Sequence, residues 1–251
     1  MTTRDFLVLI VYAPALVGND GRTLAVVHAV ERALPGLRLE WKVSEDGHPI
    51  VLPQRDAWLA EAAARGEFPL VCNGDESYPV TIYGLATSAR SASGGQPLLD
   101  IHADLPLDAA GIAAAVDVLC GVAESARSFW GHATPHSAAV EISGQTRDPA
   151  RKPGVPPRGL PALKFPDKIR SPEIPHRLGW LNYWSAAAAR AIGFPDPARD
   201  ADLLKRARRT ATGGWVVRLT DAPLALDNPA HLDALKRAYE RFPEIGGRST
   251  P

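Results

Sequence analysis

The sequence feature that most restricts the fold is a proline-rich segment in the second half of the chain. Residues 146–176, TRDPARKPGVPPRGLPALKFPDKIRSPEIPH, hold eight of the 23 prolines. Each proline fixes its own φ and disfavours helix in the residue before it, so this segment is predicted to be extended. Its apolar residues Leu160, Leu163, Phe165 and Ile169 would serve no purpose in a free linker. We therefore expect an arm, residues 147–177, wrapped over one domain rather than a linker between two.

Short apolar strands alternate with helices before the arm, and a helix, a strand and a second helix follow it. Strands are expected at residues 6–12, 38–43, 68–72, 80–85, 98–104 and 215–219, and helices at residues 23–34, 56–65, 108–130, 181–192 and from 229 onward. Asp108 and Asn228 are the expected N-caps of two of these helices. The order predicts a single α+β domain, residues 1–251, with a mixed, largely antiparallel sheet covered by helices and a Pro-rich surface arm.

The charges are balanced overall but unevenly distributed. The chain has 28 basic and 28 acidic residues, which argues against a dedicated nucleic-acid-binding protein. Residues 1–146 carry 9 basic and 17 acidic residues, residues 147–177 carry 8 and 3, and residues 178–251 carry 11 and 8. The acidic first part is either an ordinary solvated surface or a face for a basic partner.

Composition and the N-terminal residues indicate a soluble, cytoplasmic protein. The mean hydropathy is −0.11, and no apolar run approaches the roughly 20 residues of a membrane span. Residues 1–18 resemble a secretory signal, but Asp5, Tyr12 and Pro14 interrupt the pattern, so we expect a buried strand instead. Two cysteines, Cys72 and Cys120, make no disulfide framework and suit a reducing compartment.

No catalytic motif stands out. His132 and His136 have the four-residue spacing of two ligands on one helical face, but Pro135 disrupts that helix and spacing identifies no third ligand. We expect these histidines near a helix terminus instead. The segment GNDGRT at residues 18–23 lacks the phosphate-loop lysine, and no serine lies in a G-x-S-x-G elbow. The sequence therefore predicts no catalytic residue, no metal and no cofactor.

Acidic residues gather at the expected strand ends. They could be paired carboxylates for acid–base work or a metal, solvated loop charges, or contacts for a protein partner. As partner-binding candidates we take Asp75, Glu76, Asp20, Glu45 and Asp46. Three aromatic residues, Trp180, Tyr183 and Trp184, have helical spacing at the start of the helix expected at 181–192, with Trp180 directly before it. Such a stripe more often belongs to the core than to a ligand or partner platform.

The segment HRLGWLNYWSAAAARAIGFPD resembles the G-W-L-x-[FY] motif of bacterial type VI and polymorphic-toxin immunity proteins, in particular the Immunity protein 52 family and related families of unknown function. FWGHATP, at residues 129–135, is similar to their aromatic-Gly-x-Ala element, and GGWVVRLTDAPLALDNPAHLDALKRAYERFPEI to their closing strand, turn and helix. These segments lie mainly after Asp108, in about half of the chain. The motif residues expected to be structural are Gly179, Trp180, Leu181, Tyr183, Trp184 and Gly131.

The resemblance implies a non-enzymatic immunity protein that binds and neutralises a cognate toxin or type VI effector, with no direct contact to nucleic acid or membrane. Acidic loops would steer it to a basic toxin surface. Two alternatives stay open: an enzyme such as a hydrolase, with a dispersed site of His132, His136 or loop carboxylates, and a module whose VPPRGLP stretch docks a partner.

Overall fold

Ten antiparallel strands form one sheet through the whole molecule. The computed structural model describes residues 5–18, 20–147 and 154–249. In these residues the strand order is β3-β2-β4-β5-β6-β1-β7-β8-β10-β9, and every pairing is antiparallel. The strands are β1 (Phe6–Pro14), β2 (Trp41–Val43), β3 (Pro49–Val51), β4 (Val71–Cys72), β5 (Thr81–Thr87), β6 (Leu98–Pro106), β7 (Trp130–Pro135), β8 (Leu181–Trp184), β9 (Ala207–Arg209) and β10 (Trp215–Arg218). The predicted single α+β domain is confirmed, and its sheet contains no parallel pair in the described residues.

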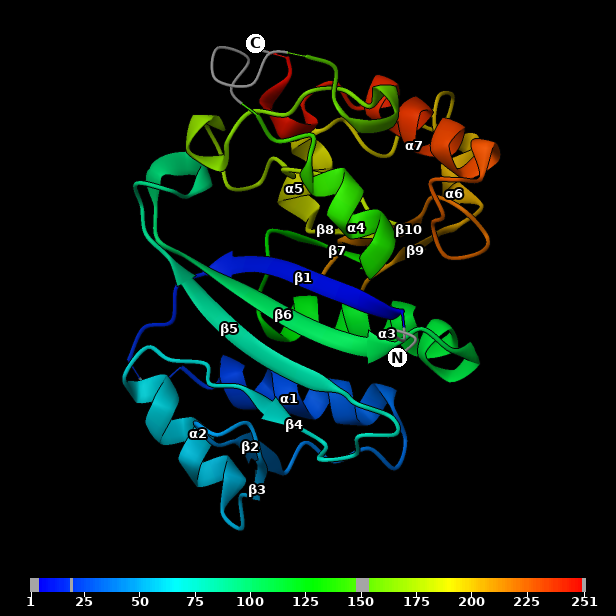
Figure 1. Ribbon diagram of the computed structural model, residues 1–251. Coiled ribbons are helices and arrows are strands. Elements are labelled where there is room, and N and C mark those ends of the chain that lie inside the picture. Colours follow the sequence, from blue (N-terminus) through cyan, green and yellow to red (C-terminus); the bar gives the residue numbers. More distant parts are fainter. Residues whose placement is uncertain (1–4, 19, 148–153, 250–251) are drawn as a thin grey trace.

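Helices cover both faces of this sheet. They are α1 (Arg22–Ala33), α2 (Arg55–Ala64), α3 (Ala109–Ser125), α4 (His136–Ser143), α5 (Ala186–Ala191), α6 (Ala201–Leu204) and α7 (Pro229–Arg241). Alternate residues of β1 (Leu7, Leu9, Val11 and Ala13) are fully buried, and α1 and α3 lie behind this part of the sheet in Figure 1. On the other face, α4 and α7 lie with the arm over the β7–β8–β10 part (Figure 1). No helix in the described ranges is long and apolar enough to span a membrane.

Two helix boundaries follow from single side chains. The Asp108 carboxylate accepts a hydrogen bond from the Gly111 amide at 2.8 Å and caps α3. The Asn228 side chain accepts one from the Ala230 amide at 3.0 Å, with Pro229 in the first turn of α7. Both caps are confirmed, because each satisfies an amide that has no partner within its helix.

The prediction of a helix at residues 181–192 was wrong in its first half. Residues 181–184 form β8, which lies between β7 and β10 and is buried at every position. A strand that is covered on both faces has a nearly continuous run of apolar residues in the sequence. The spacing of its hydrophobic residues therefore cannot be distinguished from that of a buried helix. Trp184 packs edge-on against Phe194 and Phe242 rather than in a helical stripe. Ser185 then caps α5.

The long helix expected at residues 108–130 also ended earlier than predicted. It stops at Ser125, and residues 130–135 form β7, which pairs with β1 and β8. Pro135 ends that strand and precedes the first residue of α4, His136. His132 therefore lies on a strand and not near a helix C-terminus as expected.

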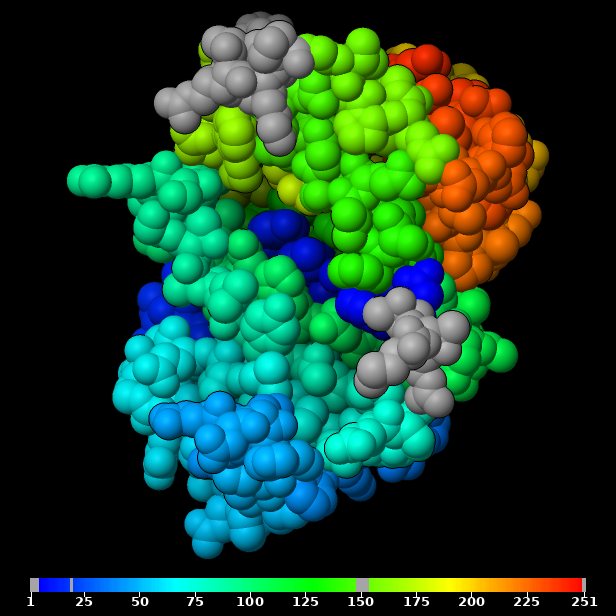
Figure 2. Space-filling model, viewed as in Figure 1, coloured from blue at the N-terminus to red at the C-terminus, as the bar shows by residue number. Residues whose placement is uncertain are grey.

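The proline-rich arm is ordered and packed on the domain, as predicted, in its described part. Leu160, Leu163 and Ile169 are buried, whereas Phe165 is 44% exposed. The Leu163 amide donates to the Gln145 carbonyl, and the Gly94 amide donates to the Ile169 carbonyl. In Figure 2 the arm, yellow-green, forms part of the outer surface near α7. Residues 148–153 of the segment lie outside the described residues.

Candidate partner-binding site

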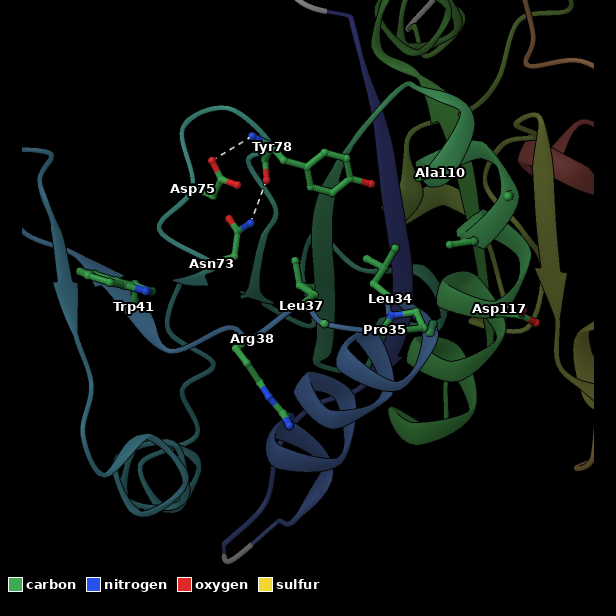
Figure 3. A pocket seen from close by; sticks show the side chains of 14 residues that line it. Leu34, Pro35, Leu37, Arg38, Trp41, Asn73, Asp75, Tyr78, Ala110 and Asp117 are labelled. Atoms are coloured by element: carbon green, nitrogen blue, oxygen red, sulfur yellow. Dashed lines mark hydrogen bonds between the residues drawn. The ribbon is translucent and has the colours of Figure 1, made fainter.

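A groove of about 760 Å³ opens between the β4–β5 loop, the end of α1 and the first turns of α3 (Figure 3). Its floor is apolar, with Leu34, Leu37 and three alanines of α3, one of which is Ala110. Trp41 of β2 lies at one side, and the Tyr78 ring points toward Ala110 at the other (Figure 3). Clefts of this size with an apolar floor and few polar groups are usual binding sites.

The β4–β5 loop is held in one shape by its own side chains. Asn73 donates to the Tyr78 carbonyl at 2.8 Å and accepts from the Val80 amide at 3.0 Å. Asp75 Oδ1 accepts from the Ser77 amide at 2.8 Å and from the Ser77 hydroxyl at 2.6 Å. These bonds hold the loop in one conformation, so any molecule that bound to it would cost the loop little conformational entropy.

Close packing fixes the same loop against β2. Gly74 has a φ of +69°, and a Cβ there would lie 2.8 Å from ring atoms of Trp41. The indole thus packs against the loop backbone at Gly74, which directly precedes the exposed Asp75 and Glu76. The loop therefore presents its acidic residues from a fixed support.

Charge around the groove is mixed, with its acidic part on the loop. Across the groove, Asp117 pairs with Arg208 at 2.6 Å, which neutralises it locally. Arg38 is 69% exposed and lies 3.5 Å from Glu31. Burial, followed by the Asp108 carboxylate, raises the pKa of Tyr78, so its phenol stays a neutral donor at neutral pH.

The remaining acidic candidates do not join this groove. Asp20 accepts from Arg22 Nε at 2.7 Å, a contact that lowers the pKa of the carboxyl, and Arg22 in turn donates to three backbone carbonyls. Asp20 thus serves to hold the start of α1. Glu45 and Asp46 are exposed in the β2–β3 turn. Because Trp41 pairs with Cys72 in antiparallel register, that turn and the β4–β5 loop lie beyond opposite ends of β2.

The two histidines considered as ligands lie in different surroundings. His132 is 3% exposed, and its Nε2 has no hydrogen-bond partner in the described residues. His136 is exposed and stacks on Phe6 with ring centroids 4.4 Å apart. The described part of the chain brings no three His, Cys, Asp or Glu side chains together as a metal site.

Burial sets the protonation of several groups near His132. Burial, followed by the nearby Arg177 guanidinium, lowers the pKa of His132 and of His176 to about 3. Burial also raises the pKa of Asp100 to about 6, against a hydrogen bond from Thr87. At neutral pH both imidazoles are therefore uncharged.

Acidification is expected to destabilise the fold through these histidines. In the unfolded chain they titrate near 6.5, so below that pH the unfolded state binds protons that the folded state excludes until about pH 3. Stability present above pH 6.5 is lost as the pH falls, by about 2 kcal/mol per histidine at pH 5. Asp100 acts in the opposite sense, because this carboxyl binds a proton more readily in the folded chain than in the unfolded chain. Its protonation offsets about 1 kcal/mol of the stability lost through the histidines at pH 5.

Urea unfolding at pH 7.5 and pH 5 measures this loss. We expect His132→Gln to reduce the difference in unfolding free energy between the two pH values by about 2 kcal/mol, whatever its effect at pH 7.5. An unchanged difference would contradict the assignment of His132 as a buried neutral group.

The residues of the G-W-L-x-[FY] motif and Gly131 lie inside the molecule. Trp180 is 1% exposed, and its Nε1 donates to the Thr220 carbonyl at 2.9 Å. A Cβ on Gly131 would lie 2.5 Å from Val11 Cγ1. Leu181, Tyr183 and Trp184 are also buried. These positions suit a structural role and offer no surface to a partner.

Sequence reasoning identified Asp75 but missed the rest of the groove. Trp41, Tyr78 and the alanines of α3 come from separate parts of the chain, and only the fold brings them together. The one available signal was NGDESYP itself, where Asn, Asp and Ser side chains commonly bond to nearby backbone in turns.

Comparisons with known proteins give a family and a fold relative. Residues 18–250 match the family described as "Domain of unknown function (DUF5953)". The solved structure of "Pseudomonas aeruginosa T6SS protein PA0821" has the same fold with a TM-score of 0.57 and 15% sequence identity, covering 95% of this chain and 73% of that one. No curated protein matches the sequence.

Proposed function

This chain belongs to the DUF5953 family, a domain of unknown function, and we propose that it is a non-enzymatic immunity protein that binds and neutralises a cognate bacterial effector. The observation that carries the proposal is the groove beside the β4–β5 loop, with its apolar floor, the internally braced Asp75 on its edge and the exposed Glu76 next to it in the loop. A preformed acidic loop beside an apolar hollow suits a basic protein surface.

The protein of similar fold supports the part of the proposal that links this chain to bacterial effectors. It is named as a type VI secretion system protein, and the two chains share their fold over 95% of this one. The Immunity protein 52 resemblance points the same way, although the family that the chain matches is DUF5953. We place the protein in the cytoplasm of the cell that makes the effector, where it would occlude the effector's active site or substrate groove.

Co-expression with the effectors encoded beside this gene tests the proposal. We expect one of them to be toxic alone, to be tolerated when this chain is present, and to co-purify with it as a stable complex. Toxicity that persists with every neighbouring effector, with no complex formed, would contradict the proposal.

A further inference from the structure

A second cavity, on the side of the molecule away from the β4–β5 loop, is lined by four arginines. It measures about 390 Å³ and lies between α6, α7 and the end of β10. Arg199, Arg206, Arg237 and Arg241 line it, together with an apolar floor that includes Leu203, Leu219 and Ala238. The only acidic side chain of its lining, Asp202, is paired with Lys205 at 2.8 Å.

One of these arginines is held in place from inside the protein. Asp200, whose side chain is fully buried, accepts from Arg241 Nε at 2.6 Å and from Nη2 at 2.9 Å. The Arg241 guanidinium also lies over the Phe242 ring, 4.7 Å from its centroid. This fixes the wall of the cavity and leaves Nη1 of Arg241 without a hydrogen bond in the described residues.

The other three guanidinium groups have donors to spare. Arg206 donates from Nη1 to the Leu219 carbonyl at 2.9 Å and lies 3.4 Å from Asp221 through Nε, so its Nη2 carries no bond among the described residues. The side chains of Arg199 and Arg237 are exposed and make no hydrogen bond or ion pair within the described ranges. Four arginines thus line one cavity, of which Arg241 is matched by the buried Asp200 and Arg206 by the exposed Asp221.

We propose that this cavity binds a small organic phosphate, with its phosphate groups on the arginines and its less polar part on the leucine and alanine floor. Guanidinium groups suit phosphate because they present paired donors to its oxygens. A ligand with a single negative charge would leave most of these arginines without a partner. A diphosphate therefore fits the cavity better than a carboxylate. The volume exceeds that of the anion alone and lies at the small end of ligand pockets. The site is independent of the proposed effector groove.

Titration calorimetry of the full chain at low salt tests the site, with inorganic pyrophosphate and ADP as probes. Both are expected to bind, ADP more tightly because of the apolar floor. Arg199→Ala with Arg237→Ala should weaken both by at least about tenfold, since charge-assisted bonds are lost. The control pair Arg190→Ala with Arg209→Ala removes two exposed charges outside the cavity and should change affinity by less than about twofold.

Three results would overturn the proposal. The first is no measurable binding of either probe to the wild-type chain. The second is a loss of affinity in the control pair equal to that in the Arg199 and Arg237 pair, and the third is an affinity for ADP no greater than that for pyrophosphate. Because both pairs replace exposed side chains, unfolding is not expected to obscure the comparison.

Discussion

Replacing Asp75 with Asn and Glu76 with Lys is expected to weaken binding of the cognate effector by at least about tenfold, mostly through a slower association rate. The change raises the net charge of the exposed loop by three. Asn keeps an Oδ1 that can accept from Ser77 and Tyr78, so the loop should keep its shape. Steered association should also lose much of its dependence on salt.

Association kinetics at about 50 mM and 300 mM salt measure both effects. The matched control is Glu61→Lys with Glu67→Gln, which makes the same change of charge on exposed residues at and after the end of α2, away from the groove. We expect the control to bind nearly as well as the wild type. Equal affinity and equal salt dependence in wild type and loop variant would show that the β4–β5 loop is not the contact.

Gly179→Ala is expected to lower the free energy of unfolding by about 3 kcal/mol or more. A Cβ at this position would lie 2.1 Å from Thr134 Oγ1 and 3.2 Å from the Ala133 carbonyl. Thr134 cannot move away without cost, because its hydroxyl accepts from the Trp180 amide. The Gly179 backbone is itself tied to the Asn182 side chain by two hydrogen bonds, of 2.9 and 3.0 Å.

Urea unfolding compares this variant with Gly21→Ala. Gly21 precedes α1 with a φ of −69°, and an added Cβ there meets nothing within 4 Å. That substitution should change stability by less than about 1 kcal/mol. A Gly179→Ala protein as stable as the wild type but unable to bind the effector would show that the motif is a contact surface and not part of the framework.

The parts of this fold that depend on a few neighbouring residues were predictable from the sequence. The Asp108 and Asn228 caps, the first strand and the packed arm each depend on a few neighbouring residues, and these predictions are confirmed. β8 was missed because its burial on both faces erases the alternation that marks a strand. The three-residue edge strands β3 and β9 carry too little pattern to be recognised.

The candidate site was less predictable than the fold. Asp75 and Glu76 were identified as loop charges, whereas Asp20 proved to be the internal partner of Arg22. The sequence alone could not distinguish Asp20 from Asp75 and Glu76, since all three carboxylates lie in polar turns after strands. The groove needs Trp41, Tyr78 and α3 at once, and the arginine cavity joins α6 to α7. Such sites arise from tertiary packing and leave no local pattern.

The most direct test of the central claim is a titration of the effector's own activity with purified chain. A binding immunity protein should inhibit in proportion to its amount, completely near equimolar ratio, with activity recovered when the complex is dissociated. Inactivation of many effector molecules by a small fraction of the chain would contradict the account, because only an enzyme turns over in that way.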